Sequence, residues 1–461
     1  MRRGLFGVGA MAIWASGCSP VQPHVPAAER ARLFSVPVPA SGEAVYEPHL
    51  AVAEDGTVLL AGQYGEGYNR GGLRFWTAWL GPDEEWNAGE AVLTRPGRTP
   101  TMAADVTVAA GPDQRWYLFG LAADSVRYGV PDASLSLALV PEGRVLARVR
   151  EVSEPRTGLL YATDKPWMVR DPGGEGREAS LVLGWTELEV DLNESPVSIR
   201  RTLVIGVASE DGRFRQEPVS VAAEAMGVQL AVASDGTLDA TWTDLREEGS
   251  ATSVRIRHAR SLDGGRSFGP AEVVADVAAD SGTAVGHGTL ASGPGGALVA
   301  CWPQWTLEAE TPSVHCAERA GDRWTGLPSP GGTEQATRAF PALAWAGGRW
   351  WLSFYEASGA VLRVSLASRA PGDPAWRDEG VLAETVGFDG RFCPAPSLPC
   401  RADPDAFFPG DYVSAAGNGS TLAVAFVLPG DGSRTDDILS VSILESGPRG
   451  AAGSAPEGGP L

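Results

Sequence analysis

Short segments in which apolar and polar residues alternate occur in pairs along the chain, and a turn rich in Gly and Asp joins the two members of each pair. Seven such pairs begin 52 to 72 residues apart. They span residues 47–64, 104–121, 164–187, 227–244, 286–304, 338–356 and 410–428. Alternation on both sides of a Gly-containing turn is typical of a β-hairpin, so each pair predicts two antiparallel strands.

The stretches between the pairs have room for two further strands each. Four strands in each of seven repeats, without a helical period, predict an all-β chain that folds as a seven-bladed β-propeller with four-stranded antiparallel blades. The last repeat has only three strand-like runs, and the run 32–40 precedes the first repeat. We expect this N-terminal strand to complete the last blade, which closes the ring. The predicted propeller spans 32–445, and we expect 446–461 to be a disordered tail.

The N-terminus has the features of an export signal. Arg2 and Arg3 precede an apolar stretch, 5–15, that is too short to span a bilayer as a stable anchor. The stretch ends in "ASGC", which resembles the bacterial lipobox and implies cleavage before Cys18 and lipidation of that residue. We therefore expect a signal peptide at 1–17, a linker at 18–31 and a protein that is lipid-anchored to the cell envelope, on the periplasmic face or the cell surface. An ordinary signal peptide with an incidental cysteine is the alternative.

The net charge and the cysteine and histidine content limit the ligands, disulfides and metal sites that we expect. The net charge of −20 disfavours nucleic acid and anionic membrane surfaces as ligands. With Cys18 reserved for lipid, four cysteines remain in an oxidising compartment, and we predict the disulfides Cys301–Cys316 and Cys393–Cys400. The five histidines are scattered and no H-E-x-x-H or C-x-x-C motif occurs, so we expect no metal and no cofactor. We expect a monomer.

The stretch "SLDGGRSF" at 261–268 matches the Asp-box, S-x-D-x-G-x-[ST]-[WF], and on it the chain resembles the sialidase-like BNR-repeat propellers. We expect Ser261 and Asp263 to bond turn amides, Gly265 to permit the tight backbone, Ser267 to complete the motif and Phe268 to pack into its blade. The resemblance implies that this turn lies away from the active face. The Asp-box is therefore predicted to be structural, and a contact surface is the alternative.

In a propeller, the inner strand of each blade begins at the face where the second strand ends, and ligands usually bind there. The repeat places polar residues at these ends. They are Asp105, Asp164, Lys165, Glu187, Asp244, Arg246, His287, Gln304, Arg338, Tyr355, Glu356, Asp411 and Tyr412. Such a ring could bind a sugar, a cation or a polar peptide, and the alternative is that these residues solvate loops. Lys165 is the only lysine of the chain, and we expect it to pair with Asp105 or Asp411.

The resemblance to sialidases would imply three arginines around a substrate carboxylate, a Tyr nucleophile with a Glu partner and an Asp acid/base. Only Arg246 and Arg338 stand at suitable places, and the Arg-Ile-Pro stretch of that family is absent. Tyr355 and Glu356 are consecutive in a strand, so they point to opposite faces. We therefore predict a propeller that binds a glycan or an envelope protein without catalysis. A divergent exo-glycosidase that uses channel-mouth carboxylates is the alternative, and an envelope scaffold is a third class.

The lipid-anchor hypothesis predicts that Cys18→Ser moves the protein from the membrane fraction to the soluble fraction, because the variant has no thiol to acylate. Fractionation and intact-mass measurement check this prediction. A variant that stays membrane-bound with unchanged mass would show that the lipobox interpretation is wrong.

Overall fold

The computed structural model describes most of the chain between residues 26 and 445. The described ranges are 26–37, 44–65, 74–81, 84–91, 102–127, 130–140, 144–151, 159–174, 176–195, 198–248, 251–277, 283–306, 311–331, 336–388, 392–394, 407–411, 413–429 and 438–445. The predicted signal peptide, Cys18, Cys400, Tyr412 and the predicted C-terminal tail lie outside them.

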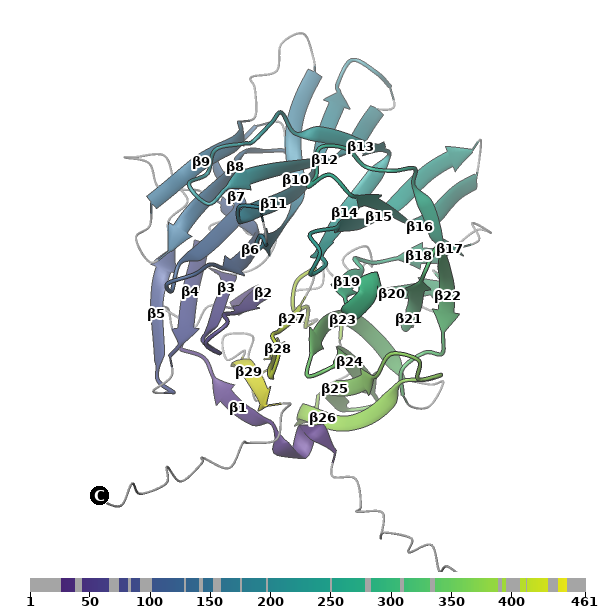
Figure 1. Cartoon of the computed structure of the whole chain (residues 1–461). Helices are drawn as coiled ribbons and strands as arrows, with labels where there is room; N and C mark the ends of the chain where they lie inside the picture. Colours follow the sequence, from purple (N-terminus) through teal and green to yellow (C-terminus); the bar gives the residue numbers. More distant parts are fainter. Residues whose placement is uncertain are drawn as a thin grey trace, which may run out of the picture.

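The chain is a seven-bladed β-propeller of antiparallel sheets around a central channel, as predicted (Figure 1). Blade 1 is β2 (Ala44–Val52), β3 (Val58–Gly65), β4 (Arg74–Leu80) and β5 (Trp86–Ala91). Blade 2 is β6 (Met102–Ala110), β7 (Trp116–Arg127), β8 (Val130–Val140) and β9 (Arg144–Glu151). Blade 3 is β10 (Leu159–Asp171), β11 (Ser180–Asp191), β12 (Ser198–Ser209) and β13 (Val219–Ala223). Blade 4 is β14 (Ala225–Val232), β15 (Leu238–Glu248), β16 (Ala251–Ser261) and β17 (Glu272–Val277).

Blade 5 differs from the others because its inner strand is broken. Both β18 (Thr283–Val285) and β19 (Thr289–Ser292) pair with β20 (Leu298–Thr306), which continues to β21 (Ser313–Ala320) and β22 (Arg323–Leu327). Blade 6 is β23 (Thr337–Ala346), β24 (Arg349–Ser358), β25 (Val361–Arg369) and β26 (Arg377–Val386). The short 3₁₀ turns η1 (Ala27–Arg30) and η2 (Pro294–Gly296) are the helical elements of the described residues. In this part of the chain no helix has the length and apolarity needed to cross a membrane.

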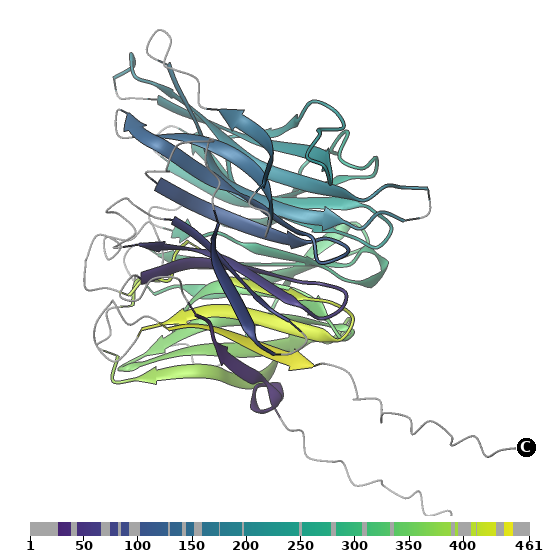
Figure 2. The same ribbon diagram turned by 90° about the vertical axis from the view of Figure 1, so that its left-hand side faces the viewer.

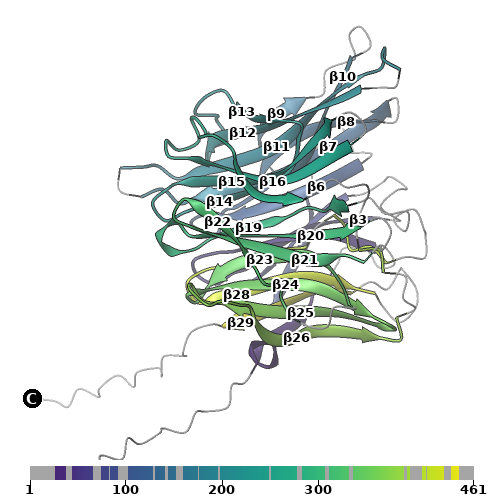
Figure 3. The same cartoon turned by 90° about the vertical axis from the view of Figure 1, so that its right-hand side faces the viewer.

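The N-terminal strand closes the ring, as predicted. Blade 7 consists of β27 (Ser414–Gly417), β28 (Thr421–Leu428) and β29 (Ile438–Glu445), and its outermost strand is β1 (Arg32–Ser35). The two chain ends pair in register, from Arg32 opposite Ile443 to Ser35 opposite Ser440. Figure 2 shows β1 beside β29, and Figure 3 shows η1 below β26 and β29.

A β-bulge recurs near the beginning of the inner strands. The register shifts in β2, β6, β10, β14 and β23. In each bulge one residue has a left-handed backbone, with φ between 49° and 71°: Glu47, Asp105, Lys165, Gly227 and Phe340. Bulges re-aim a side chain and are common next to functional sites. Around the channel, each of these bulges turns one residue out of the normal side-chain alternation of its strand.

Apolar side chains pack between neighbouring blades, and side-chain to backbone hydrogen bonds join several inner strands. The amide of Leu50 in blade 1 donates to Ser414 Oγ of blade 7 at 3.2 Å. The amide of Val108 in blade 2 donates to His49 Nδ1 of blade 1, also at 3.2 Å. These bonds align the inner strands around the channel.

The disulfide Cys301–Cys316 forms between β20 and β21, where the two residues lie opposite each other, so this predicted pairing is confirmed. Cys393 is also disulfide-bonded. Its predicted partner, Cys400, lies outside the described residues.

The Asp-box has the predicted internal hydrogen bonds. Ser261 Oγ accepts a bond from the Gly265 amide at 2.8 Å, and Asp263 Oδ1 accepts one from the Ser267 amide at 2.9 Å. Phe268 packs against the apolar cluster shared by blades 3 and 4. Ser261 pairs with Leu238 at the start of β15, so the turn lies at the strand ends opposite the channel mouth. We call that surface the Asp-box face and the other the mouth face.

Candidate functional site

The inner-strand bulges bring charged side chains from four blades together at the channel. Glu47 of β2, Asp105 of β6 and Lys165 of β10 occupy equivalent bulge positions, and Asp411 precedes β27 of blade 7. We call these four residues the Lys165 cluster. It is nearly closed to solvent, since the side chain of Lys165 is 11% exposed and those of Asp105 and Asp411 are 5% and 3% exposed.

Lys165 connects blades that are not neighbours in the ring. Its ammonium donates to Asp105 Oδ1 of blade 2 at 2.8 Å and to Asp411 Oδ2 of blade 7. The predicted pairing of Lys165 is therefore present with both carboxylates at once. The lysine of blade 3 thereby links to the blade that closes the ring.

Glu47 is a member of the cluster that we did not predict from the sequence. Its Oε1 accepts a hydrogen bond from the Asp411 amide at 3.0 Å, and its Oε2 accepts one from Gln63. Gly410, with φ of 113°, allows this contact, because a Cβ there would lie 2.3 Å from Glu47 Cγ. A signal existed in the sequence: Glu47 precedes a proline at the same repeat position as Lys165.

The buried carboxylates perturb one another. Oxygens of Glu47, Asp105 and Asp411 lie within 4.8 Å of each other. Burial, and then the neighbouring Asp105, raise the pKa of Glu47 to about 8, although Lys165 opposes the shift. Glu47 is therefore largely protonated at neutral pH.

Lys165 and the adjacent Asp164 are shifted by the same surroundings. Burial alone would lower the pKa of Lys165, but the carboxylates of Asp105, Asp411, Asp164 and Glu47 together hold it well above its usual value. Burial raises the pKa of Asp164 to about 6, against the opposing effect of Lys165. Asp164 Oδ1 accepts a bond from the Lys165 amide at 3.0 Å. Asp164 is only partly buried, so it keeps some access to solvent.

Three clustered carboxylates are also the oxygen ligands that a hard divalent cation prefers. The Lys165 ammonium, however, already lies against two of them. With this lysine in place, the positive charge that balances the carboxylates comes from the protein itself.

A cavity of about 290 Å³ follows the cluster along the channel, lined by all seven inner strands. Its wall combines apolar side chains with the polar groups of His49, Arg170, Thr289 and Ser414. The ring of His49 contacts the edge of Trp167 at 4.8 Å, and burial lowers the pKa of His49 to about 3, so this histidine is neutral. The Lys165 cluster therefore lies between the mouth face and the channel cavity.

Several predicted mouth residues pair within their own blades instead of joining the cluster. Asp244 Oδ2 accepts from Arg257 Nε at 3.1 Å in blade 4, and Glu356 Oε2 accepts from Arg338 Nε at 3.1 Å in blade 6. Glu187 accepts from the indole of Trp185 at 3.4 Å in blade 3.

The prediction that Tyr355 lies at the channel mouth is wrong. Tyr355 is fully buried, and its hydroxyl donates to the Val427 carbonyl at 2.6 Å and accepts from the Val427 amide at 2.9 Å. It packs among Phe340, Phe392 and Phe407, and so joins blades 6 and 7. Strand alternation explains this, because Tyr355 points between the blades while Glu356 points the other way.

The other predicted mouth residues have separate positions. His287 is half-buried against Gly227, where a Cβ would lie 2.4 Å from the His287 Nδ1. Gln304 is half-buried and pairs with Val285 in blade 5. Arg246 belongs to β15, but its side chain, like the whole of Tyr412, lies outside the described part of the chain.

Comparisons with known proteins bear on the fold. No protein-family model matches the chain, and no curated protein matches its sequence. Among solved structures, an ulvan lyase of polysaccharide lyase family PL25 with bound sugar is 8% identical, with a TM-score of 0.52 over 90% of this chain and 96% of that one. An α-L-arabinofuranosidase from Fusarium graminearum is 9% identical, with a TM-score of 0.46 over 90% of this chain and 98% of that one.

A third similar structure is the NanB sialidase from Streptococcus pneumoniae, which is 12% identical, with a TM-score of 0.42 over 89% of this chain and 70% of that one. At such low identity these likenesses concern the propeller fold alone.

The raised pKa of Glu47 predicts a pH dependence of stability. Between about pH 4.5, its usual value, and about pH 8, the folded protein holds a proton that the unfolded chain releases, so the free energy of unfolding falls as the pH rises. Glu47→Gln should remove this component, which is of order 1 kcal/mol per pH unit for one proton. Urea unfolding of both proteins at several pH values within this window measures the difference.

Glu178→Gln is the matched control, because the Glu178 side chain is 92% exposed and should leave the pH dependence unchanged. If Glu47→Gln and the wild type have parallel pH profiles, Glu47 does not hold a proton in the folded state.

Proposed function

We propose that the protein is an exported lipoprotein of the bacterial cell envelope whose propeller binds a glycan at the mouth face, next to the Lys165 cluster, without turning it over. The "ASGC" sequence at Cys18 supports the anchor. The arrangement around Lys165 supports a binding role over a hydrolytic one.

The position of the Lys165 ammonium carries this proposal. Most glycosidases place two carboxyl groups on either side of the glycosidic bond, about 5–5.5 Å apart in retaining and about 6.5–9.5 Å apart in inverting enzymes. Here the ammonium is bonded to both Asp105 and Asp411. A glycosidic bond would have to take the place of this buried cation, which is costly because it would leave two buried carboxylates unpaired.

The sialidase arrangement also lacks support among the described residues. Arg338, one of the two arginines at suitable sequence positions, is 5% exposed and paired with Glu356. The hydroxyl of Tyr355, the tyrosine considered as a nucleophile, is hydrogen-bonded to the backbone carbonyl and amide of Val427. Neither side chain is available to a substrate at the mouth.

The proposal of a carbohydrate ligand rests on the chemistry of Asp164 at the mouth face and on the similarity in fold to the ulvan lyase. Asp164, partly exposed beside Lys165, is an acceptor for sugar hydroxyls. The ulvan lyase, whose propeller covers nearly the same length, was solved with bound sugar. This analogy raises the expectation of a carbohydrate ligand and says nothing about which one.

One observation favours the alternative of a divergent exo-glycosidase. A glycosidase needs a general acid with a raised pKa. Burial raises the pKa of Glu47 to about 8, and one of its carboxyl oxygens lies within 4.8 Å of one of Asp105. Glu47 is fully buried, however, so hydrolysis would require the cluster to open.

A glycan array with the mature chain carrying Cys18→Ser tests the proposal, followed by calorimetry and sugar-release assays on the glycans that bind. We expect binding without release. Asp164→Asn should weaken binding about tenfold or more, since a hydrogen bond to a charged group contributes about 1.5–3 kcal/mol. Its melting temperature should not fall, because Asn keeps the oxygen that accepts the Lys165 amide and removes a carboxylate whose charge the folded state disfavours.

Asp276→Asn on the outer strand β17, where the side chain is 61% exposed, is the control and should bind as the wild type does. Released sugar would establish the glycosidase instead, and no binding to any glycan would contradict both functions and favour a scaffold.

A further inference from the structure

A second and larger cavity lies on the Asp-box face, between blades 3 and 4. Its volume is about 590 Å³. Blade 3 contributes the β10–β11 turn and residues that follow β12, and blade 4 contributes the β14–β15 turn and the Asp-box turn. The strand β10 runs from Lys165 near the mouth to Asp171 at this cavity, so the two sites lie on opposite faces. We call it the blade 3–4 cleft.

The walls of the cleft are fixed by hydrogen bonds. Gln216 of blade 3 donates to the Gly265 carbonyl of the Asp-box at 3.2 Å and so joins the two walls. Arg177 Nη1 donates to Asp171 Oδ2 at 2.7 Å, and its guanidinium lies over Gly236, where a Cβ would be 1.7 Å from Nη1. These contacts are made between protein groups on both walls, so a ligand would meet a preformed site.

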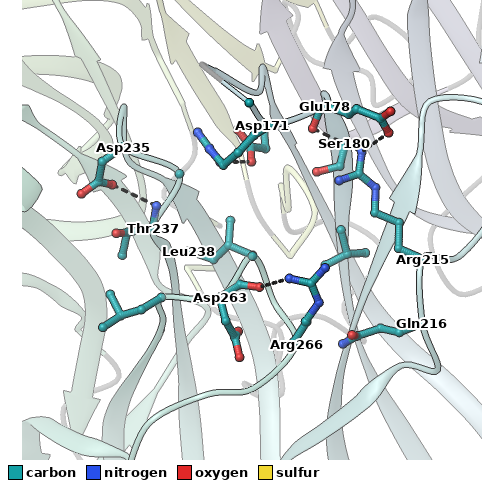
Figure 4. Close-up of a pocket in the computed structure, with 16 residues that line it drawn as sticks. Asp171, Glu178, Ser180, Arg215, Gln216, Asp235, Thr237, Leu238, Asp263 and Arg266 are labelled. Carbon is teal, nitrogen blue, oxygen red and sulfur yellow. Dashed lines mark hydrogen bonds and ion pairs between the residues drawn. The ribbon is translucent and has the colours of Figure 1, made fainter.

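Two arginines in the cleft keep donors for a ligand. Among the described residues, Arg215 makes all its polar contacts through Nη2, to the carbonyls of Glu178 and Ala179 and to the Glu178 carboxylate. Arg266 contacts only the Asp263 carbonyl, through Nη1, within the same part of the chain. Figure 4 shows Arg215 and Gln216 on one side of the cleft, Asp235 and Thr237 on the other, and Arg266 below.

The acidic residues of the cleft keep their charge and bond to Arg177, to groups of their own turns or, weakly, to Arg215. Asp171 is paired with Arg177. Asp263 accepts from the hydroxyl and amide of Ser267, which lower its pKa to about 2 and hold its carboxylate within the turn. Asp235 accepts from the Thr237 amide at 2.9 Å. The contact of Arg215 with Glu178 is long, at 3.7 Å, and Glu178 is almost fully exposed.

The apolar residues that line the cleft, and the lack of aromatic ones among the described residues, indicate which class of ligand it suits. No aromatic side chain lines the described part of the cleft, so it has no surface on which a sugar ring could stack. Its apolar contribution comes from Val207, Leu238 and Leu262, and Leu262 is 81% exposed at the tip of the Asp-box turn. The guanidinium edge formed by Nε and Nη2 binds a carboxylate in bidentate fashion, and among the described residues Arg266 keeps this edge while Arg215 keeps single donors at Nε and Nη1. An exposed leucine beside Arg266 favours an apolar neighbour.

From this combination we propose that the blade 3–4 cleft binds an acidic peptide segment of a partner protein. A Glu or Asp side chain of the segment would contact Arg215 and Arg266, and an adjacent apolar side chain would cover Leu262. This function is independent of ligand binding at the mouth face, and it assigns the Asp-box turn of this chain a contact role in addition to its structural one.

Synthetic peptides that carry Glu-Leu pairs in a Gly/Ser background, with matched Gln-Leu peptides, test the proposal in the mature chain with Cys18→Ser. Fluorescence polarisation should detect binding of the Glu-Leu series only, and added salt should weaken it. Arg266→Gln should weaken binding about tenfold, the effect of losing one charge-assisted hydrogen bond. Leu262→Ser should weaken it as well.

Arg213→Gln is the matched control, because Arg213 lies in the neighbouring turn, is 87% exposed and does not line the cleft. The proposal is overturned if no Glu-Leu peptide binds, if Arg213→Gln weakens binding as much as Arg266→Gln, or if uronic-acid oligosaccharides bind through Arg266 and the peptides do not. Asp164→Asn should leave peptide binding unchanged, which separates this result from that at the mouth.

Discussion

The ion-paired ammonium of Lys165 is the interaction on which the centre of this propeller depends. It joins β10 of blade 3 to Asp105 of blade 2 and to Asp411, which leads into blade 7. Blade 7 is also where the two ends of the chain meet, through β1 and β29. A buried ion pair is weak evidence for net stability, but removal of one partner is strongly destabilising because a charge is left unpaired. The cluster therefore specifies one arrangement of the inner strands more than it adds to the overall stability.

The same arrangement limits the chemistry at the mouth face. The acids of the Lys165 cluster are either bonded to Lys165 or, like Glu47, protonated and buried. Asp164 lies at the border of the cluster, where it is partly exposed. The mouth face thus combines a closed charged centre with a partly exposed Asp164, and the Asp-box face has a cleft whose arginines keep donors that no described residue occupies. Under the two proposals made above, the protein would bind a different partner at each face.

The repeat pattern predicted most of the fold. Alternation around Gly-rich turns gave the seven hairpins, and the unmatched run at 32–40 gave the closing strand β1. Two successive apolar runs put Cys301 and Cys316 on neighbouring strands, β20 and β21, where the structure has them opposite each other. The single lysine, at a predicted strand end, led to its pairing with Asp105 and Asp411. These features depend on local pattern, which a sequence displays directly.

The bulges account for much of what was missed. A bulge inserts one residue, and a shift of one residue moves a side chain to the other face of a strand. Strand period alone therefore could not place Glu47 in the cluster. Tyr355 was misplaced for a different reason: its position on the strand was right, but its side chain points between blades 6 and 7, where Val427 binds its hydroxyl. The cleft between blades 3 and 4 depends on how two blades meet, which no single repeat encodes.

A double-mutant cycle on Lys165 and Asp411 tests the central claim most directly. The free energy of unfolding is measured by urea denaturation for Lys165→Met, Asp411→Asn and the double variant, with the exposed pair Arg363 and Glu384, 41% and 48% exposed, as reference. We expect Lys165→Met alone to lower the free energy of unfolding by about 3–5 kcal/mol. The double variant should be more stable than the sum of the two single effects predicts, by about 1 kcal/mol or more. The coupling energy of the exposed pair should be less than about 1 kcal/mol. Additive effects within about 0.5 kcal/mol would contradict it, because the ammonium would then not hold blades 3 and 7 together through Asp411.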